Sequence, residues 1–189
     1  MPRPLKVVGI GGTLRDGSST ERLVAAVLAA CADQGAQTRL FGGSALKALP
    51  HFNPESPERT EGERALVEAV RTADAIVIGS PGYHGGVSGL VKNAIDLLED
   101  LARDIRPYFD GRPVGLIVSA AGWQATGITL AALRGITHAM RGWPTPLGIA
   151  VNTVAQKPFG ADGALVDADV AAAIAAQARQ IMSFSLGAA

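Results

Sequence analysis

Short apolar runs alternate with longer helical patterns along the whole chain. The run "DAIVIGS" at 74–80 is apolar at almost every position, which is expected of a strand covered on both faces in a parallel sheet. The segments that predict strands are "KVVGI" at 6–10, "TRLFG" at 38–42, "DAIVIGS" at 74–80, "PVGLIVS" at 113–119 and "LGIAV" at 147–151.

The segments between these strands carry apolar residues at helical spacing. Residues 20–34 place an apolar stripe on one face of a helix. Ser18 and Glu21 have the S-x-x-E spacing of a capping box at the start of this helix. Residues 42–60 contain two glycines and three prolines and predict a loop. Further helices are expected at 61–72, 88–102, 126–140 and 167–183.

Five strands that alternate with five helices predict one α/β domain over residues 1–189, with helices on both faces of a parallel sheet. In such sheets, ligands bind outside the carboxyl ends of the strands, near the point where the strand order reverses. The loops after the strands at 6–10, 74–80 and 113–119 are therefore the places where a functional site is expected.

Composition and charge narrow the functional classes. Among 189 residues, 17 basic and 17 acidic side chains give a net charge of zero, so nothing favours a nucleic-acid or acidic-membrane partner. Cys31 is the single cysteine, which excludes a disulfide framework, and its apolar helical setting predicts a buried, unreactive thiol. Because no signal-peptide core and no stretch of about 18 apolar residues is present, we expect a cytoplasmic protein.

The loop "GGTLRDGSST" at 11–20 predicts a phosphate site. The N-terminus of the following helix offers open backbone amides and a positive dipole end, and an arginine gives bidentate contacts to phosphate. The lysine of a P-loop is absent, and Leu14 stands where a dinucleotide fingerprint needs glycine, so a terminal phosphomonoester fits better. A helix start that is merely capped is the structural alternative. The polar side chains are Thr13, Arg15, Ser18, Ser19 and Thr20.

Two further loops offer glycine-rich backbone and an aromatic side chain to a ligand. In "SPGYHGG" at 80–86, the glycines permit close approach of a ligand and Tyr83 presents a flat face, although a tight turn with a packed tyrosine is the alternative. "SAAGWQATG" at 119–127 again has small residues, followed by Trp123, which alone would suit a core or interface position. A phosphate at the first loop and a planar ring over these two have the shape of FMN.

At this point the motifs resemble those of a known family, the NAD(P)H-dependent FMN reductases. "GGTLRDGSSTERL" resembles its pattern G-[ST]-x-R-x-x-S-x-x-x-x-L, and "SPGYHGGVSGLVKNAIDLL" resembles [ST]-P-x-Y-x-[GS]-x-x-[SP]-G-x-[LV]-K-N-x-[IL]-D. The resemblance implies a flavodoxin-like fold with a five-stranded parallel sheet in the order 2-1-3-4-5. It also implies FMN as cofactor, NADPH or NADH as hydride donor, and a homodimer or homotetramer with the helix at 88–102 as a candidate interface.

The resemblance also assigns cofactor-binding residues, position by position. The FMN phosphate would be held by Thr13, Arg15, Ser18 and Thr20. The isoalloxazine would be bordered by Pro81, Gly82, Tyr83, His84 and Gly85, with Ser119 and Gly122 on its other side. We assign no catalytic side chain and no metal, because the cofactor carries the chemistry.

Several other polar residues are expected to be structural. Lys92 and Asp96 are spaced for an i,i+4 pair on a helix, and Asn93 is a candidate to anchor a neighbouring loop. We expect His51 and His138 to lie at the surface or in packing contacts.

The function implied is hydride transfer from NADPH or NADH to FMN, with a flavin-dependent monooxygenase as a candidate recipient of the reduced flavin. One alternative is a prosthetic FMN that reduces a quinone, an azo dye or a metal oxyanion. Another is a flavodoxin-like electron carrier, which the zero net charge disfavours, since docking to redox partners favours a strongly acidic surface. A flavin-free protein that binds another phosphate at the first loop is the third.

Overall fold

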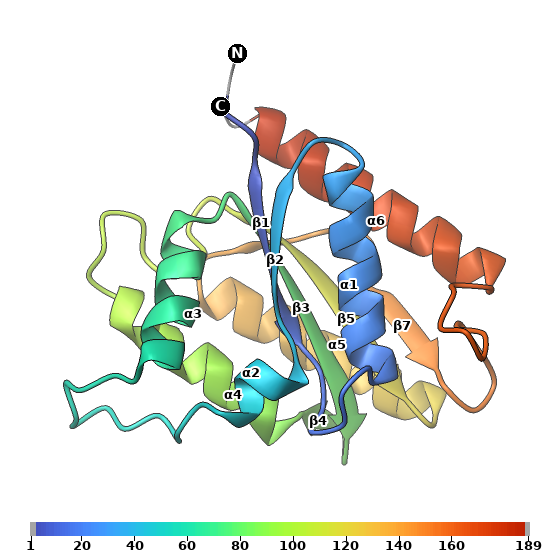
Figure 1. Ribbon diagram of the computed structural model, residues 1–189, viewed down its shortest axis with the longest axis horizontal. Helices are drawn as coiled ribbons and strands as arrows, with labels where there is room; N and C mark the ends of the chain where they lie inside the picture. Colours follow the sequence, from blue (N-terminus) through green and yellow to red (C-terminus); the bar gives the residue numbers. More distant parts are fainter. Residues whose placement is uncertain (1–2, 188–189) are drawn as a thin grey trace.

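The computed structural model describes residues 3–187 and shows a sheet between two layers of helices (Figure 1). The strands are β1 (Lys6–Gly11), β2 (Gln37–Phe41), β3 (Ala75–Tyr83), β4 (Gly86–Val87), β5 (Pro113–Ala120), β6 (Trp143–Pro144) and β7 (Ile149–Asn152). The helices are α1 (Ser19–Ala32), α2 (Gly43–Lys47), α3 (Glu61–Thr72), α4 (Gly89–Asp96), the 3-10 helix η1 (Leu97–Leu101), α5 (Trp123–Ala139) and α6 (Ala168–Gly187).

The sheet confirms the parallel α/β prediction but corrects its strand count. The path runs β2-β1-β3-β5-β6 with parallel pairs, and the sheet has seven strands instead of five. Beyond β5, β6 pairs with its beginning and β7 with its end, so two short strands share one position. Trp143 and Thr145 donate to the chain at the start of β5, but the next donor, Leu147 N, is bonded to Gln180 Oε1 of α6. Leu116 O on β5 accepts from Gln177 Nε2 of the same helix, so the ladder is interrupted there. The remaining strand, β4, is an antiparallel extension of β3.

The two faces of the sheet are covered by different helices. Successive strand residues point to opposite faces, so Val7 belongs to the core under α1 and α6, and Val8 to the core under α3, α4 and α5. Figure 1 shows α1 and α6 on one side of the sheet and α3 and α4 on the other. Since both faces are covered, the β3 segment 75–78 is buried at every position, as its unbroken apolar pattern predicted.

Glycines in the strands bring α1 close to the sheet. A Cβ on Gly79 would lie 2.3 Å from Val24 Cγ2, and a Cβ on Gly9 would lie 2.7 Å from Leu28 Cδ1. Larger residues would therefore push α1 away. This close packing sets the first turn of α1 directly over the carboxyl ends of β1 and β3.

Near residue 43 the structure has a short helix that was not predicted, and the capping box predicted for α1 is incomplete. The short helix α2 lies inside the segment 42–60 that was predicted to be a loop. Ser18 Oγ accepts from Glu21 N as expected, but the Glu21 carboxylate accepts from Gly43 N at 2.7 Å and does not return to Ser18. Glu21 thus stabilises the N-terminus of α2, and the predicted capping box is wrong in its second half. A complete capping box forms at Thr60 and Glu63.

Two further bounds differ, at either side of the β3–α4 connection. The predicted helix at 88–102 is α4 followed by η1, a change from α to 3-10 geometry after Asp96. The strand predicted at 74–80 continues to Tyr83, because β4 pairs with its last residues.

The expected structural roles of the polar residues on α4 are confirmed. Lys92 Nζ lies 2.6 Å from Asp96 Oδ1. Asn93 anchors the preceding loop, because its Oδ1 accepts from Phe52 N at 2.8 Å and its Nδ2 donates to Pro50 O at 2.9 Å. The long segment before α3 is thereby fixed against α4.

Cys31 is fully buried in α1, as predicted, and burial raises the pKa of its thiol to about 11. The thiol is protonated at neutral pH and hence unreactive. His51 and His138 are both exposed. No helix within residues 3–187 combines the length and apolar character needed to cross a membrane.

Candidate functional site

The three predicted loops meet at the carboxyl ends of the strands around a cavity of about 380 Å³. Its volume lies in the range of small-molecule sites. Of the sequence-predicted residues, all line it except His84, Gly85 and Gly122. The full lining consists of Thr13, Arg15, Ser18, Ser19, Thr20, Pro81, Gly82, Tyr83, Ser119, Ala120, Ala121 and Thr153.

Among residues 3–187, Arg15 is the only cation that lines this cavity, and its guanidinium is available to a ligand. Thr13 Oγ1 accepts from Arg15 N at 3.2 Å and donates to Arg15 O at 3.3 Å, which fixes the backbone of the loop. The side chain of Arg15 is exposed, and nothing within residues 3–187 accepts a hydrogen bond from it. The geometry therefore leaves a positive charge at the N-terminus of α1, where an anion is favoured.

Two of the predicted phosphate ligands already have structural hydrogen bonds. The buried Ser18 hydroxyl caps α1, and Thr20 Oγ1 lies 2.6 Å from Ser119 Oγ. This buried pair joins the start of α1 to the end of β5. A hydroxyl oxygen has a second lone pair, so these groups can still contact a ligand, but their first role is to hold the loops together.

Sequence reasoning missed Thr153, which follows β7. Its N–H donates to Ala120 O at 2.8 Å, and its hydroxyl donates to the same carbonyl at 3.3 Å. The signal was present, because β7 is parallel to β5 and its carboxyl end must lie at the same sheet edge. We expected sites only after the first, third and fourth predicted strands.

The glycine-rich segment after β3 is a β-hairpin. Tyr83 pairs with Gly86 across a two-residue turn in which His84 has φ 51° and Gly85 has φ 78°. Positive φ at both central residues is the mark of a type I′ turn, the connection that matches strand twist. Gly82 serves packing, since a Cβ there would lie 3.0 Å from Thr129 Oγ1. The hairpin holds the Tyr83 ring at the cavity edge with 56% of the residue exposed.

The strained position of His84 yields a stability prediction. A non-glycine residue with left-handed φ costs about 1 kcal/mol, and asparagine tolerates that region best. We expect His84→Asn to stabilise the fold by about 0.5–1 kcal/mol and to raise Tm by roughly 1–4 °C, measured by thermal unfolding. Gly85→Asn, at the other turn position, is the comparison and should destabilise. A lower Tm for His84→Asn would show that the imidazole itself stabilises the hairpin.

A second cavity of about 410 Å³ adjoins the first. Thr13, Arg15, Pro81 and Tyr83 line both cavities. The second is completed by Gly12, Leu14, Ser88, Gly89 and Leu90. Its walls are therefore the first loop on one side and the N-terminus of α4 on the other.

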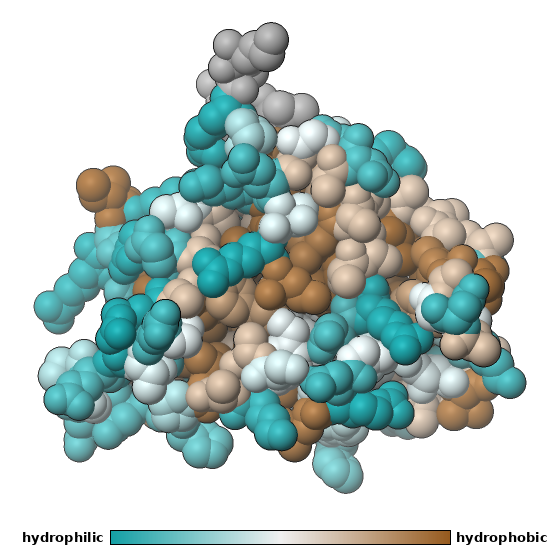
Figure 2. Space-filling model, in the orientation of Figure 1, coloured by the Kyte–Doolittle hydropathy of each residue, from teal (hydrophilic) through white to brown (hydrophobic). Residues whose placement is uncertain are grey.

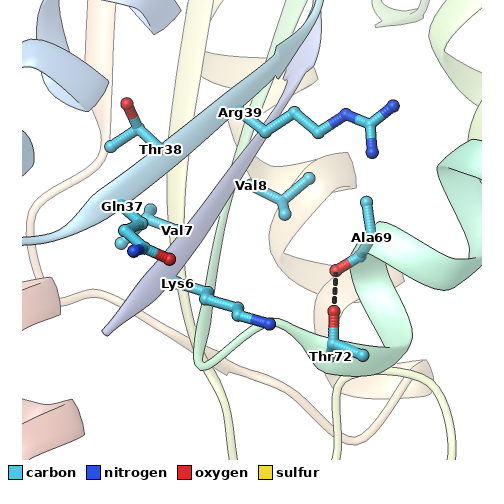
Figure 3. A pocket seen from close by; sticks show the side chains of 8 residues that line it. All are labelled: Lys6, Val7, Val8, Gln37, Thr38, Arg39, Ala69 and Thr72. Carbon is cyan, nitrogen blue, oxygen red and sulfur yellow. Dashed lines mark hydrogen bonds between the residues drawn. The ribbon is translucent and has the colours of Figure 1, made fainter. Parts of the chain in front are cut away.

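A third hollow, of about 230 Å³, lies at the opposite end of the sheet. Figure 3 shows Lys6 and Arg39 extending from the first residues of β1 and the middle of β2 toward the end of α3, where Thr72 bonds the Ala69 carbonyl. Figure 2 shows apolar surface in the middle of the same face, where β2 runs. None of the predicted site residues lines this hollow, so it is separate from the candidate site.

The first cavity combines the groups that a phosphate and a flat ring require. The free Arg15 guanidinium and the Ser19 hydroxyl lie at the helix N-terminus, and Pro81, Gly82 and the small residues Ala120 and Ala121 leave room beside Tyr83. A flavin mononucleotide has both parts, a terminal phosphate and a planar ring system. The residues present therefore fit FMN.

Solved structures support the fold. An oxidoreductase from Corynebacterium diphtheriae superposes with a TM-score of 0.72 at 21% identity, over 97% of this chain and 98% of that one. The flavoenzyme NAD(P)H:(acceptor) oxidoreductase from Paracoccus denitrificans gives a TM-score of 0.73 at 21% identity, over 95% and 98%. A flavodoxin, WrbA-like protein from Agrobacterium tumefaciens superposes with a TM-score of 0.65 at 19% identity, over 98% and 99%. At these identities the likeness establishes an α/β flavodoxin-like fold.

Sequence comparison establishes the family. An FMN-dependent NADPH-azoreductase from Staphylococcus aureus is 34% identical over 99 residues, which are 52% of this chain and 49% of that protein. The chain spans about half the length of the curated relatives that it matches. The sequence profile described as NADPH-dependent FMN reductase matches residues 5–157, which include all three loops of the first cavity. Because this match covers most of the chain, the protein belongs to the NADPH-dependent FMN reductase family.

Proposed function

We propose that this protein is an NAD(P)H:FMN oxidoreductase that transfers hydride from NADPH or NADH to FMN. The observation that carries the proposal is the first cavity, where an unpaired Arg15 guanidinium at the N-terminus of α1 adjoins small, apolar walls. Membership of the family implies FMN and a nicotinamide donor. The arrangement supports FMN, since it offers an anion site beside room for a ring.

The residues of the chain bind and orient, and the bound FMN supplies the redox chemistry. Arg15 and Ser19 hold the phosphate by charge-assisted and hydroxyl hydrogen bonds. Pro81, Gly82 and Tyr83 border the ring, and the Thr20–Ser119 hydrogen bond keeps the first and third loops at a constant separation. Three residues expected at the ring do not line the cavity: His84, Gly85 and Gly122. They belong to the loops that do line it, so we place them at the margin of the ring. Orientation of two rings accounts for the rate, because no general base is required.

Oxidation of NADPH and of NADH, followed at the nicotinamide absorbance with FMN varied, tests the proposal. We expect turnover that depends on FMN and saturates in the micromolar range. Absence of turnover with both nucleotides, in protein shown to be folded, would refute it.

A second candidate function is supported by the azoreductase relative. In that case FMN stays bound and an azo compound is reduced, as the name of that relative states. A quinone and a metal oxyanion are the other acceptors expected from the sequence. Activity in protein purified with its flavin, without added FMN, distinguishes this function from the release of reduced flavin to a monooxygenase. Protein that retains flavin but does not oxidise either nucleotide would instead support an electron carrier.

We also propose self-association as a homodimer or homotetramer through α4. Its Lys92–Asp96 pair is surface-located, and Leu90 is only partly buried. The molar mass measured by light scattering during size-exclusion chromatography tests this, and a value near 19.4 kDa would contradict it.

A further inference from the structure

We propose that Arg22 is a positioning residue for the phosphate of the cofactor and raises the preference of the site for FMN over uncharged riboflavin. Arg22 does not line the first cavity. It contacts the first loop, and a hairpin at 158–166 holds its guanidinium in place. The inference rests on the proposed function, in which FMN occupies the first cavity, and adds to it a residue and a physical basis for ligand selectivity.

The Arg22 guanidinium packs against the first loop. Arg22 is the fourth residue of α1. A Cβ added at Gly17 would lie 3.6 Å from both Nε and Nη2 of Arg22, which is ordinary van der Waals contact. Gly17 has φ 63°, a left-handed conformation that favours glycine. The guanidinium therefore lies against the turn that immediately precedes Ser18, the residue that caps α1.

The hairpin at 158–166, which follows β7, contacts the same guanidinium. Phe159 and Leu165 form its antiparallel bridge, and both pack onto the core under α1 and α6. The Cζ atom of Arg22 lies 5.7 Å from the centre of the Phe159 ring, a cation–π contact. A Cβ on Gly163 would lie 3.7 Å from Arg22 Nη1. The hairpin is thus anchored in the core and fixes the guanidinium beside the first loop.

The family likeness does not account for this contact. The match to the family profile ends at residue 157, before the hairpin begins. Arg22 lies within the first motif, at a position where the pattern G-[ST]-x-R-x-x-S-x-x-x-x-L specifies no residue. The role of Arg22 must therefore be inferred from the structure of this chain.

The charge of Arg22 is not paired within residues 3–187. The side chain is exposed, and no described carboxylate forms an ion pair with it. The acidic side chains beside it in the sequence have other partners. Asp16 accepts from Ser44 Oγ at 2.7 Å, and Glu21 accepts from Gly43 N at 2.7 Å. The guanidinium keeps its full positive charge.

Two cations at the start of α1 favour a doubly charged anion. Arg15 and Arg22 both lie at the positive end of the helix dipole, where a cation is disfavoured. A phosphomonoester carries nearly two negative charges at neutral pH, so it balances both cations. Riboflavin lacks this group. Arg22 should therefore strengthen phosphate binding by fixing the turn at Gly17 and by adding positive potential there.

The test compares FMN with riboflavin, which has the same ring system and no phosphate. Quenching of flavin fluorescence during titration with apoprotein at low salt gives both Kd values. Arg22→Gln removes the charge and should raise the FMN Kd roughly three- to fivefold, with the riboflavin Kd within about 1.5-fold of wild type. Arg22→Lys keeps the charge without the planar guanidinium and should give an intermediate FMN Kd. The matched control Arg179→Gln, exposed on α6 outside both cavities, should change neither Kd.

A second pair of variants tests the hairpin. Phe159→Leu keeps apolar bulk but removes the face of the ring, so the FMN Kd should rise about two- to threefold. Phe159→Tyr keeps the ring and should leave the FMN Kd unchanged. The pair separates loss of the cation–π contact from a general effect of substitution in the hairpin.

Salt dependence distinguishes this role from a merely structural one. The difference in FMN Kd between Arg22→Gln and wild type should become smaller as salt is added, since salt screens exposed charges. An unchanged FMN Kd in Arg22→Gln, equal weakening of FMN and riboflavin, or an effect that does not vary with salt would each overturn the inference. Failure of FMN-loaded wild type to oxidise either nucleotide would instead refute the proposed function, because the titrations contain no nucleotide.

Discussion

Replacing Arg15 by alanine is expected to weaken FMN binding by about 1.5–3 kcal/mol, which corresponds to roughly a 10- to 150-fold higher Kd. A charge-assisted hydrogen bond from guanidinium to phosphate is worth this much, and Arg15 has no described internal partner to compensate for its loss. Because the side chain is exposed, the substitution should leave the fold stable. Quenching of FMN fluorescence during titration with apoprotein measures the Kd.

Two comparisons make the Arg15 result specific. Arg15→Lys keeps the charge but loses the bidentate geometry, so its Kd should lie between wild type and alanine. Arg103→Ala removes an exposed arginine outside both cavities and should leave the Kd unchanged. The difference in FMN Kd between Arg15→Ala and wild type should also become smaller as salt is added, since salt screens the exposed charge. An unchanged Kd in Arg15→Ala would contradict the phosphate assignment.

Replacing Arg112 by alanine is expected to destabilise the protein by roughly 3–4 kcal/mol, the largest effect on folding that we predict. The residue is 0% exposed, yet no carboxylate in the described part of the chain, residues 3–187, forms an ion pair with it. Its guanidinium donates to Ala73 O at 3.0 Å, to Arg71 O at 2.8 Å and to Tyr108 O. The first two are carbonyls at the end of α3, where a cation is favoured by the helix dipole. Alanine would remove the donor from Arg71 O and Tyr108 O, would leave Ala73 O with only Arg106 Nη1 at 3.4 Å, and would leave a cavity behind.

Urea unfolding followed by circular dichroism measures this loss, with Arg103→Ala as the surface control. Arg112→Lys should recover part of the stability, because an ammonium group reaches fewer of the carbonyls. Burial, with a smaller contribution from Arg106, lowers the pKa of Arg112 to about 10. The unfolded chain holds this proton more tightly, so the group makes stability rise with pH only above about pH 10. The loss in Arg112→Ala should therefore be equal at pH 6 and pH 8. A loss of stability below about 1 kcal/mol in Arg112→Ala would refute the role of Arg112 as the donor to the carbonyls at the end of α3.

The sequence predicts much of the fold because each buried face leaves a local period. The helix predicted at 61–72 has the same bounds as the observed α3. The unbroken apolar strands correctly predict a parallel sheet covered on both faces. The same reasoning places the cavity at the carboxyl ends of the strands. The motif resemblance predicts the family that the profile match confirms.

What the sequence could not show are partners far apart in the chain. Thr20 and Ser119 are 99 positions apart and share a buried hydrogen bond, and Glu21 caps α2 instead of its own helix. No pattern in the sequence marks Arg112 as the buried donor to the carbonyls at the end of α3.

By itself, then, the sequence determined the longer helices, the sheet type and the loops that carry the site, because local periodicity records which side of an element is buried. Only the tertiary structure decided the split of the last strand into β6 and β7, the turn of the Tyr83 hairpin and the second cavity beside the first. Those features depend on which backbone and side-chain groups meet in space, and a hydrogen bond or a cavity wall leaves no period in the chain.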